Sequence, residues 1–283
     1  MLGDTAIVID SASYLSPAIR ERYEMIVVPM RVVLDGSEYR EFEDLDSRTF
    51  YDALASGVPV STSQPPPGAF VDAYEAARRN GARRALSIHI GSNLSGTVNS
   101  ARIAAGLARI PVDVIDTGQA SFIEGLCVLE AAEALENGAA VESIREVVAS
   151  TSRAAGNVFI VGGLRLLEQG GRIARGAETP PGVPVLALVE GAVRPVGSAT
   201  TTTEALDAML DHLDEAIARQ PDKSMRVGVG NGCADGLARD LEARVRERGP
   251  DLEVIPYEIG PAVGAHTGAG CTGLVYLPRP VSV

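Results

Sequence analysis

The feature that most limits the fold is a regular alternation of strand and helix patterns between residues 85 and 153. Short runs of buried-type residues, as expected of strands, alternate there with longer amphipathic runs, as expected of helices. The expected strands are 85–90 and 112–116, and the expected helices are 97–107, 121–136 and 142–153. Strands connected by helices usually form right-handed βαβ units in one parallel sheet. The sequence therefore predicts an α/β fold.

The rest of the chain extends this pattern in both directions. The elements expected before it are a strand at 5–9, helices from Ser16 and Ser47, a β-rich run at 25–34 with a hairpin turn at Asp35 and Gly36, a loop at 60–68 and a helix at 70–80. The elements expected after it are strands at 158–161, 226–230, 252–255 and 274–277, a hairpin of 185–189 and 192–196, and helices at 201–218 and 234–246. Because a second α/β unit begins near Asn157, we expect two domains, 1–156 and 157–283.

The composition favours a folded cytoplasmic protein. Hydrophobic residues make up 46% of the 283 residues, so a large core can be buried. The net charge of −12 opposes binding to nucleic acid. The chain has three cysteines, an odd number, and they are widely spaced, which indicates reduced thiols rather than a set of disulfides. The N-terminus has no signal-peptide pattern and no apolar run approaches ~20 residues, so we expect a soluble, cytoplasmic chain with no stable membrane insertion.

Two hydroxyl-rich segments are candidates for a binding site. Segment 61–65 reads Ser-Thr-Ser-Gln-Pro, and segment 92–97 reads Ser-Asn-Leu-Ser-Gly-Thr between an expected strand and an expected helix. Ligands of open α/β sheets collect at the carboxyl ends of strands, where the next helix offers free N–H groups to an anion. An anion near Ser95 and Gly96 is therefore one interpretation. The alternatives are a proline-rich connector at 61–65 and simple helix capping by Ser95 or Thr97.

Two glycine-rich segments also carry chemically useful side chains. Segment 170–173 reads Gly-Gly-Arg-Ile, which either exposes the Arg172 guanidinium to a partner or ligand or forms a tight turn with a surface charge. Segment 264–268 places His266 among small residues in an expected loop. That histidine is either structural or part of a site.

Several familiar motifs fail on their context. Segment 268–273 spells G-x-G-x-x-G but leads into an expected strand rather than a helix, so we expect no dinucleotide site. The chain has no Walker A pattern, and no G-x-S-x-G elbow surrounds Ser95. His266 and Cys271 lack a second pair that would complete a zinc site. We therefore expect no metal and no cofactor.

Six short motifs follow one another along the chain. They are Asp10-Ser11, Thr62-Ser63-Gln64-Pro65, Leu94-Ser95-Gly96-Thr97, Asp116-Thr117, Gly170-Gly171-Arg172-Ile173 and Ala265-His266-Thr267-Gly268. In this order they resemble the DegV family of bacterial fatty-acid-binding proteins. The resemblance runs over nearly the whole chain.

The resemblance implies a fold and a site. The fold is two α/β domains, an N-terminal parallel-sheet domain and a C-terminal α/β domain, with a ligand tunnel between them. Thr62 and Ser95 would bind the carboxylate of a long-chain fatty acid, with His266 nearby and with Ser92 and Gly96 in the same site. A protonated His266 would help to offset the cost of burying that carboxylate.

The resemblance also implies a partner and a non-catalytic role. The partner is a fatty acid kinase, which phosphorylates the carboxylate while the carrier holds it, and Arg172 would contact this kinase. The carrier itself would catalyse nothing.

Some positions depart from the family pattern. Gly91 stands where Ser is common, and Thr200 stands where many members carry an arginine of the kinase-facing surface. The segment after Arg172 is also several residues short. Thr200 motivates one alternative, a kinase-independent lipid sensor or buffer. A second alternative is a hydrolase or acyl transferase with Ser95 as nucleophile and His266 as base.

Overall fold

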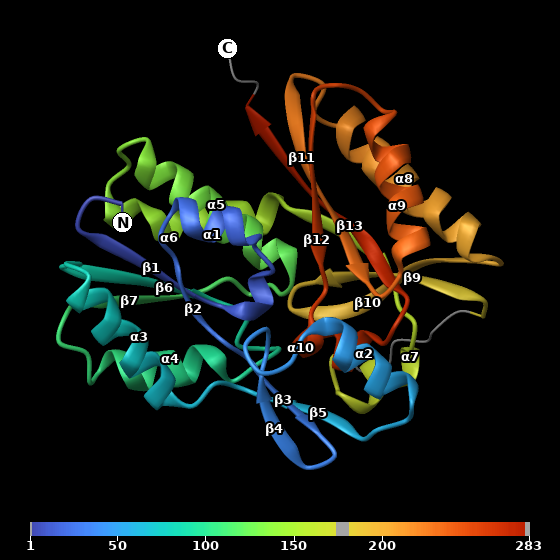
Figure 1. Ribbon diagram of the computed structural model, residues 1–283. Coiled ribbons are helices and arrows are strands. Elements are labelled where there is room, and N and C mark those ends of the chain that lie inside the picture. The colour runs from blue at the N-terminus through green and yellow to red at the C-terminus, as the bar shows by residue number, and fades with distance from the viewer. Residues whose placement is uncertain (1, 174–180, 281–283) are drawn as a thin grey trace. The chain divides into compact units, whose positions relative to one another are not determined.

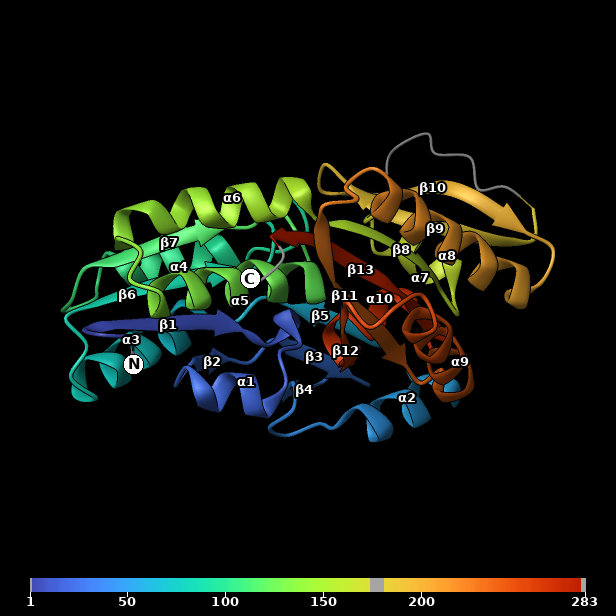
Figure 2. The ribbon, with the colours of Figure 1, turned by 90° about the horizontal axis from the view of Figure 1, so that it is seen from above.

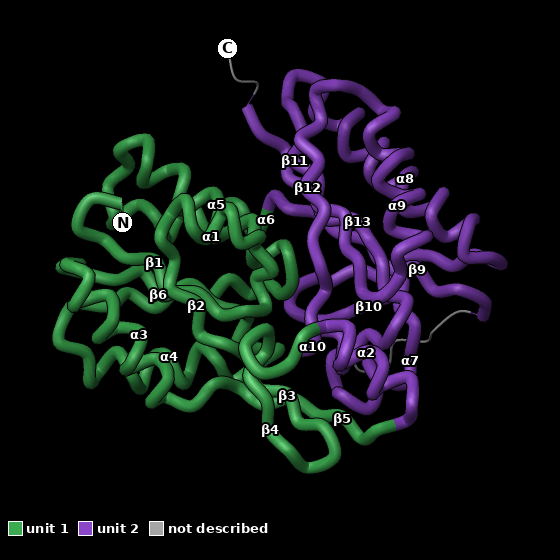
Figure 3. Tube along the Cα trace, in the orientation of Figure 1, with its two compact units in different colours: residues 1–46, 58–153 green, residues 47–57, 154–283 purple. Residues whose placement is uncertain are grey.

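The chain divides into two compact units, shown in two colours in Figure 3. The computed structural model describes residues 2–173 and 181–280. Unit 1 comprises residues 1–46 and 58–153, and unit 2 comprises residues 47–57 and 154–283. The expected division into 1–156 and 157–283 differs from these units in two short segments, 47–57 and 154–156.

Unit 1 is built on a four-stranded parallel sheet (Figure 1), in the order β2-β1-β6-β7. Its strands are β1 (Thr5–Asp10), β2 (Ile26–Val28), β6 (Arg84–His89) and β7 (Val112–Asp116). All three neighbouring pairs are parallel, which confirms the parallel sheet predicted from the alternation of strands and helices. Strand β6 lies between β1 and β7, so the carboxyl ends of all three meet at one edge of the sheet.

Helices cover both faces of this sheet. They are α1 (Pro17–Arg22), α3 (Pro67–Arg79), α4 (Thr97–Ala105), α5 (Phe122–Glu136) and α6 (Ile144–Ala154), with short 3-10 turns η1 (Ser11–Ser13) and η2 (Val141–Ser143). Helices α3 and α4 lie on one face, and α5 and α6 lie on the other (Figures 1 and 2). Phe70 and Tyr74 of α3 are buried among alanines of α4 and the sheet, which lets the helices approach closely.

A small antiparallel sheet of unit 1, in the order β4-β3-β5, carries the first hydroxyl-rich segment. Its strands are β3 (Arg31–Leu34), β4 (Ser37–Arg40) and β5 (Val60–Ser63). The predicted hairpin turn is confirmed, because Asp35 and Gly36 connect β3 to β4 with φ values of 47° and 78°.

The expected loop at 60–68 is wrong at both ends. Its first residues form β5, which pairs with β3 through Thr62 and Val32, and its last residues begin α3 at Pro67. The β-branched residues of 60–63 favour a strand, and a proline is well suited to the first turn of a helix.

Unit 2 is built on a six-stranded mixed sheet, in the order β10-β9-β8-β13-β11-β12. Its strands are β8 (Gly156–Ile160), β9 (Val183–Val189), β10 (Ala192–Ala199), β11 (Lys223–Gly232), β12 (Leu252–Glu258) and β13 (Cys271–Pro280). Only the pairing of β11 with β12 is parallel among the pairings of these six strands. The predicted hairpin around Glu190 and Gly191 is confirmed by the antiparallel pairing of β9 with β10.

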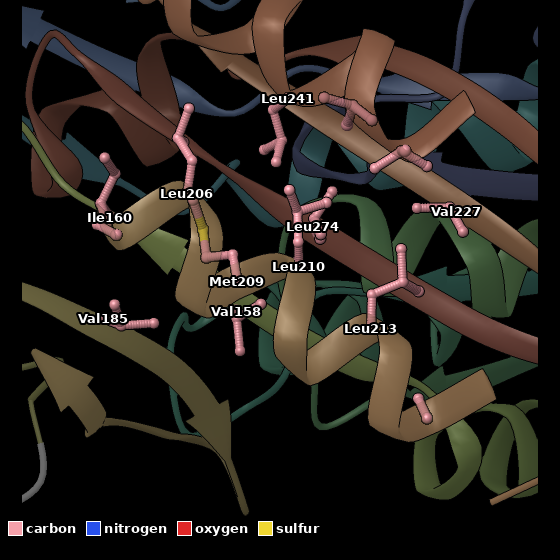
Figure 4. Packing of buried hydrophobic residues seen from close by; sticks show 14 of the residues in the cluster. Val158, Ile160, Val185, Leu206, Met209, Leu210, Leu213, Val227, Leu241 and Leu274 are labelled. Carbon is pink, nitrogen blue, oxygen red and sulfur yellow. The ribbon is translucent and has the colours of Figure 1, made fainter. Parts of the chain in front are cut away.

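The core of unit 2 lies between this sheet and two long helices. The helices of the unit are α2 (Ser47–Ala55), α7 (Leu164–Gln169), α8 (Thr202–Ala218), α9 (Asp235–Arg246) and α10 (Pro261–Thr267). Figure 4 shows Leu206, Met209 and Leu210 of α8 pointing at Val158 and Leu274 of the sheet. Thr201 caps α8, the helix expected at 201–218, because its side chain accepts the amide of Glu204 at 3.2 Å.

Helix α2 belongs to unit 2 although its neighbours in the sequence belong to unit 1. The hydroxyl of Tyr51 donates to the carbonyl of Ile259 at 2.9 Å, and both groups are buried. Gly264 of α10 leaves room for the rings of α2, because a Cβ there would lie 2.6 Å from the Tyr51 hydroxyl and 2.9 Å from Phe50. These contacts explain why 47–57 packs with unit 2: Tyr51 binds a residue 208 positions away, which no local sequence pattern indicates.

Candidate functional site

The second hydroxyl-rich segment lies where the ligand of an open α/β sheet is expected. Residues 90–96 follow β6 at the carboxyl edge of the parallel sheet and lead into α4. The Oγ of Ser95 accepts the amide of Thr97 at 3.3 Å and lies 2.8 Å from its Oγ1. The N-cap residue of α4 is Gly96, which makes no side-chain cap hydrogen bond, so the predicted capping by Ser95 or Thr97 is wrong and Ser95 instead closes a short turn onto Thr97. The positive end of the helix dipole lies beside Ser95 and Gly96.

Two contacts within unit 1 bring the Thr62 segment to this helix start. A Cβ on Gly96 would lie 3.0 Å from the side-chain Cδ of Gln64, so Gln64 rests directly on the Gly96 backbone. The hydroxyl of Thr97 donates to the sulfur of Met30 at 3.5 Å. Met30 immediately precedes β3, the strand that pairs with Thr62. The two hydroxyl-rich segments thus meet in space, although Gln64 and Gly96 are 32 positions apart in the sequence.

Thr62 and Ser95 are half-buried, while Ser92 and Gly96 are exposed. The amide of Ser92 donates to Oδ1 of Asp116 at 3.1 Å. The segment therefore combines hydroxyls with a helix start, which suits an oxygen-rich anion. The roles assigned to Thr62, Ser92, Ser95 and Gly96 stay predictions.

The two glycine-rich segments also meet, within unit 2. The expectation that His266 lies in a loop is wrong: it lies in the last turn of α10. A Cβ on Gly170 would lie 2.6 Å from Nδ1 of His266, so only glycine fits beside the imidazole. The Arg172 guanidinium donates to the carbonyl of Gly170.

This packing sets the charge of His266. Burial lowers the pKa of His266 to about 4, and the nearby positive charge of Arg172 adds to the effect. His266 is therefore neutral at pH 7 in this structure, and its protonation beside a bound carboxylate stays a prediction. Burial also lowers the pKa of Arg172, whose guanidinium is half-buried. Its contact with a partner protein stays a prediction.

His266 belongs to unit 2, whereas Thr62 and Ser95 belong to unit 1. The prediction that His266 lies near the other two stays a prediction, and so does the ligand tunnel. The alternative with Ser95 as nucleophile and His266 as base also stays a prediction, because its two residues belong to different units. Within unit 1, Ser95 and the histidine of β6 do not form such a pair. The Oγ of Ser95 lies against Thr97, and the buried His89 contacts Asp10 and Ser87 instead.

Unit 1 also contains a group of buried acids that no sequence pattern indicated. Asp10, Glu41 and Glu124 are all buried. Burial raises the pKa of Glu124 well above its usual range, and the neighbouring charges of Asp10 and Glu41 raise it further. The available signal was weak: an aspartate ends both β1 and β7, the two strands beside β6.

Comparisons with known proteins identify relatives over nearly the full length. The model of a family described as "Uncharacterised protein, DegV family" matches residues 4–279. A DegV domain-containing protein of Streptomyces coelicolor is 35% identical over 281 residues, which cover 97% of this chain and 98% of the relative.

Two solved structures have the same fold. The first is described as fatty acid binding of a DegV family protein from Thermus thermophilus, with 31% identity, a TM-score of 0.89, and coverage of 97% of this chain and 99% of that one. The second is DegV, a fatty acid binding protein from Bacillus subtilis, with 26% identity, the same TM-score of 0.89 and the same coverage of 97% and 99%. Among residues 2–173 and 181–280, no helix has the length and apolar character needed to cross a membrane.

Proposed function

Because this chain belongs to the DegV family, we propose that it binds a long-chain fatty acid by the carboxylate, at Thr62 and Ser95, and catalyses no reaction by itself. The observation that carries the proposal is the contact of Gln64 with Gly96, which joins the two hydroxyl-rich segments at the start of α4. The relative from Thermus thermophilus, described as fatty acid binding, supports the same ligand class.

The two ends of the ligand have different energetic roles. An acyl chain of ~16 carbons, buried at about 0.8 kcal/mol per methylene, contributes on the order of 10 kcal/mol. A hydrogen bond to the charged carboxylate contributes about 2 kcal/mol. The tail therefore supplies most of the affinity, and the head group fixes orientation and excludes uncharged lipids. Hydroxyls and the α4 dipole offset the cost of desolvating the carboxylate.

Calorimetric titration with palmitate and with the matching uncharged alcohol tests this assignment. The protein is expected to bind palmitate much more tightly than the alcohol. The double variant Thr62→Ala, Ser95→Ala loses two such hydrogen bonds and is expected to lose affinity for palmitate by roughly 100- to 1000-fold, while its affinity for the alcohol changes little. Ser61→Ala, an exposed hydroxyl on the same strand, is the matched control. Unchanged palmitate affinity in the double variant would remove Thr62 and Ser95 from the site.

We further propose that the bound acid is presented to a fatty acid kinase. A carboxylate held by its oxygens at a strand edge is a suitable acceptor for a phosphoryl group that another protein supplies. The kinase of the same organism, given ATP and palmitate-loaded protein, should then produce an acyl phosphate. Palmitate alone, without the carrier, is the control.

One observation favours a second candidate, a lipid sensor or buffer that uses no kinase. Thr200 is exposed, and its backbone amide donates to Glu204 at the start of α8. The position therefore offers no positive charge to a partner. If the organism's own kinase leaves the bound acid unmodified, the sensor or buffer is the better account.

A further inference from the structure

Aspartates from the two strands beside β6 hold the loop that carries Ser95. They form hydrogen bonds to its backbone where it leaves β6. Asp10 is the last residue of β1, and Asp116 is the last residue of β7. The amide of Ile90 donates to Oδ2 of Asp10 at 3.0 Å. The amide of Ser92, two residues further along, donates to Oδ1 of Asp116 at 3.1 Å. Neither aspartate touches Ser95 in these contacts, yet both bind the backbone that leads to it.

A third hydrogen bond holds the loop between these two. The amide of Gly91 donates to the carbonyl of Gln119 at 2.7 Å. A Cβ on Gly91 would lie 2.7 Å from the carbonyl carbon of Gly118, so the two backbones touch. The successive amides of Ile90, Gly91 and Ser92 thus donate to groups at or just beyond the ends of β1 and β7. This arrangement leaves the loop little freedom in how it leaves β6.

The two aspartates use their oxygens differently. Asp10 uses both: Oδ1 accepts the amide of Ala12 at 3.1 Å, and Oδ2 accepts from Ile90 and faces Nδ1 of His89 at 3.1 Å. In Asp116 a single oxygen, Oδ1, accepts both backbone hydrogen bonds: one from the amide of Ser92 and one from that of Gly118 at 2.9 Å.

The environments of the two aspartates also differ. Asp10 is fully buried, and His89 in turn contacts the buried Ser87 at 2.6 Å. Asp116 is half-buried. Burial raises the pKa of Glu124 well above its usual range, and the nearby charge of Asp10 raises it further, so the protonated form of Glu124 is favoured beside the Asp10 carboxylate.

We propose that Asp10 and Asp116 are positioning residues for the anion site at Ser95, acting only through the backbone of the loop. The inference rests on the proposed function, because the anion is the fatty acid carboxylate. Their negative charges are compatible with an anion site because each carboxylate is satisfied by backbone amides. They align the loop so that the Ser95 hydroxyl faces the ligand.

The different use of oxygens makes the same substitution act differently at the two positions. Asp10→Asn must turn an NH2 group toward either Ala12 or Ile90, whose amides are also donors, so it loses either the hydrogen bond to the loop at Ile90 or the one to Ala12 that holds the Asp10 side chain in place. Asp116→Asn can keep its carbonyl oxygen toward both amides, whereas Asp116→Ala loses both. Asp113→Asn is the matched control, because Asp113 lies on the same strand, is exposed and pairs with Arg145 instead of the loop.

Affinity for palmitate is the first measurement. Asp10→Asn and Asp116→Ala are each expected to weaken binding about tenfold, and Asp116→Asn is expected to recover most of the loss. Asp113→Asn should bind like the unaltered protein. Wild-type affinity in both Asp10→Asn and Asp116→Ala would overturn the proposal. If Asp10→Asn does not fold, the Ala and Asn variants at the half-buried Asp116 decide the question alone.

A double-mutant cycle separates positioning from a general structural role. If Asp10 acts through Ser95, Asp10→Asn should cost little further affinity once Ser95 is already alanine. A full tenfold loss in the Ser95→Ala background would show that Asp10 acts elsewhere and would overturn the inference.

Hydrogen exchange of the protein without ligand keeps this inference distinct from the proposed function. Amides of 90–97 are expected to exchange faster in Asp10→Asn and Asp116→Ala than in the unaltered protein. If the unaltered protein binds no palmitate but the exchange changes as expected, the proposed function fails and the fastening of the loop stands. If palmitate binds but exchange in the loop is unchanged, the positioning role fails and the proposed function stands.

Discussion

Gly170 and His266 are packed so tightly that a single methyl group should disturb them. A Cβ on Gly170 would lie 2.6 Å from Nδ1 of the imidazole. Gly170→Ala is therefore expected to lower the free energy of unfolding by about 1–3 kcal/mol. Gly236→Ala in α9, where nothing lies within 4 Å, is the control and should be neutral or slightly stabilising. Chemical denaturation of both variants provides the measurement, and equal stability would refute the close packing.

The neutral state of His266 predicts a pH dependence of stability. Its pKa is lowered from 6.5 to about 4, so between these values the unfolded chain binds a proton that the folded chain does not. The contribution of His266 to stability is complete above pH 6.5 and is lost as the pH falls toward 4. His266→Asn should lack this part of the decline. NMR titration of the imidazole gives the midpoint directly, and a midpoint near 6.5 would contradict the burial argument.

The same titration tests the predicted place of His266 in the head-group site. A carboxylate beside the imidazole favours its protonated form. Adding palmitate should therefore move the midpoint upward from about 4. A midpoint that is the same with and without palmitate would remove His266 from the site.

The buried Glu124 predicts that stability changes with pH in the direction opposite to that for His266. Its pKa is raised, so the folded chain holds a proton that the unfolded chain releases above its ordinary pKa. The resulting stability is complete at low pH and is lost as the pH rises. Glu124→Gln, which keeps the shape of the protonated acid, should gain stability over the unaltered protein at pH 8 relative to pH 5. Parallel stability curves from pH 5 to 8 would mean that Glu124 is ionised in the fold.

At the scale of elements, the contacts of α2 with α10 predict that a change in α2 alters the stability of α10. The Tyr51 hydroxyl binds the Ile259 carbonyl at 2.9 Å in a buried position. Tyr51→Phe is expected to cost about 1–2 kcal/mol, because the carbonyl is left unsatisfied. Amides of α10 should then exchange faster. Tyr39→Phe in β4 of unit 1 is the control and should leave the exchange rates of the α10 amides unchanged. Equal rates in the two variants would contradict the predicted effect of α2 on α10.

Elements with a strong local pattern were predicted well, and elements defined by distant partners were not. The alternation at 85–153 and the hairpins at Asp35-Gly36 and Glu190-Gly191 are confirmed, because period and turn chemistry determine them locally. Strand β5 was missed because only its pairing with β3 distinguishes it from a proline-rich loop. Helix α10 was missed because glycine and a short length hide a helical pattern in 264–268.

The candidate site divides in the same way. Ser95 and Gly96 could be found from the strand-to-helix transition alone, since that place has a general affinity for anions. Thr62 could not be linked to them without the family resemblance, because the link is a contact of Gln64 with Gly96. The fastening by Asp10 and Asp116 depends on strand order, which the sequence did not determine.

At the scale of the whole molecule, the chain combines a parallel-sheet unit and a mixed-sheet unit. A match over residues 4–279 and a TM-score of 0.89 to proteins described as fatty acid binding show that both units belong to one family fold. The proposed fatty acid site is therefore to be tested on the full chain, which a bound ligand should stabilise against unfolding.

The most direct test of the central claim is mass spectrometry of the lipid that accompanies the purified protein. The chain is purified without denaturation and extracted with organic solvent, and fatty acids are quantified against protein. We predict close to one long-chain fatty acid per chain, and a marked loss in the Thr62→Ala, Ser95→Ala variant. A chain that carries no fatty acid, and takes up none when palmitate is added, would contradict the account.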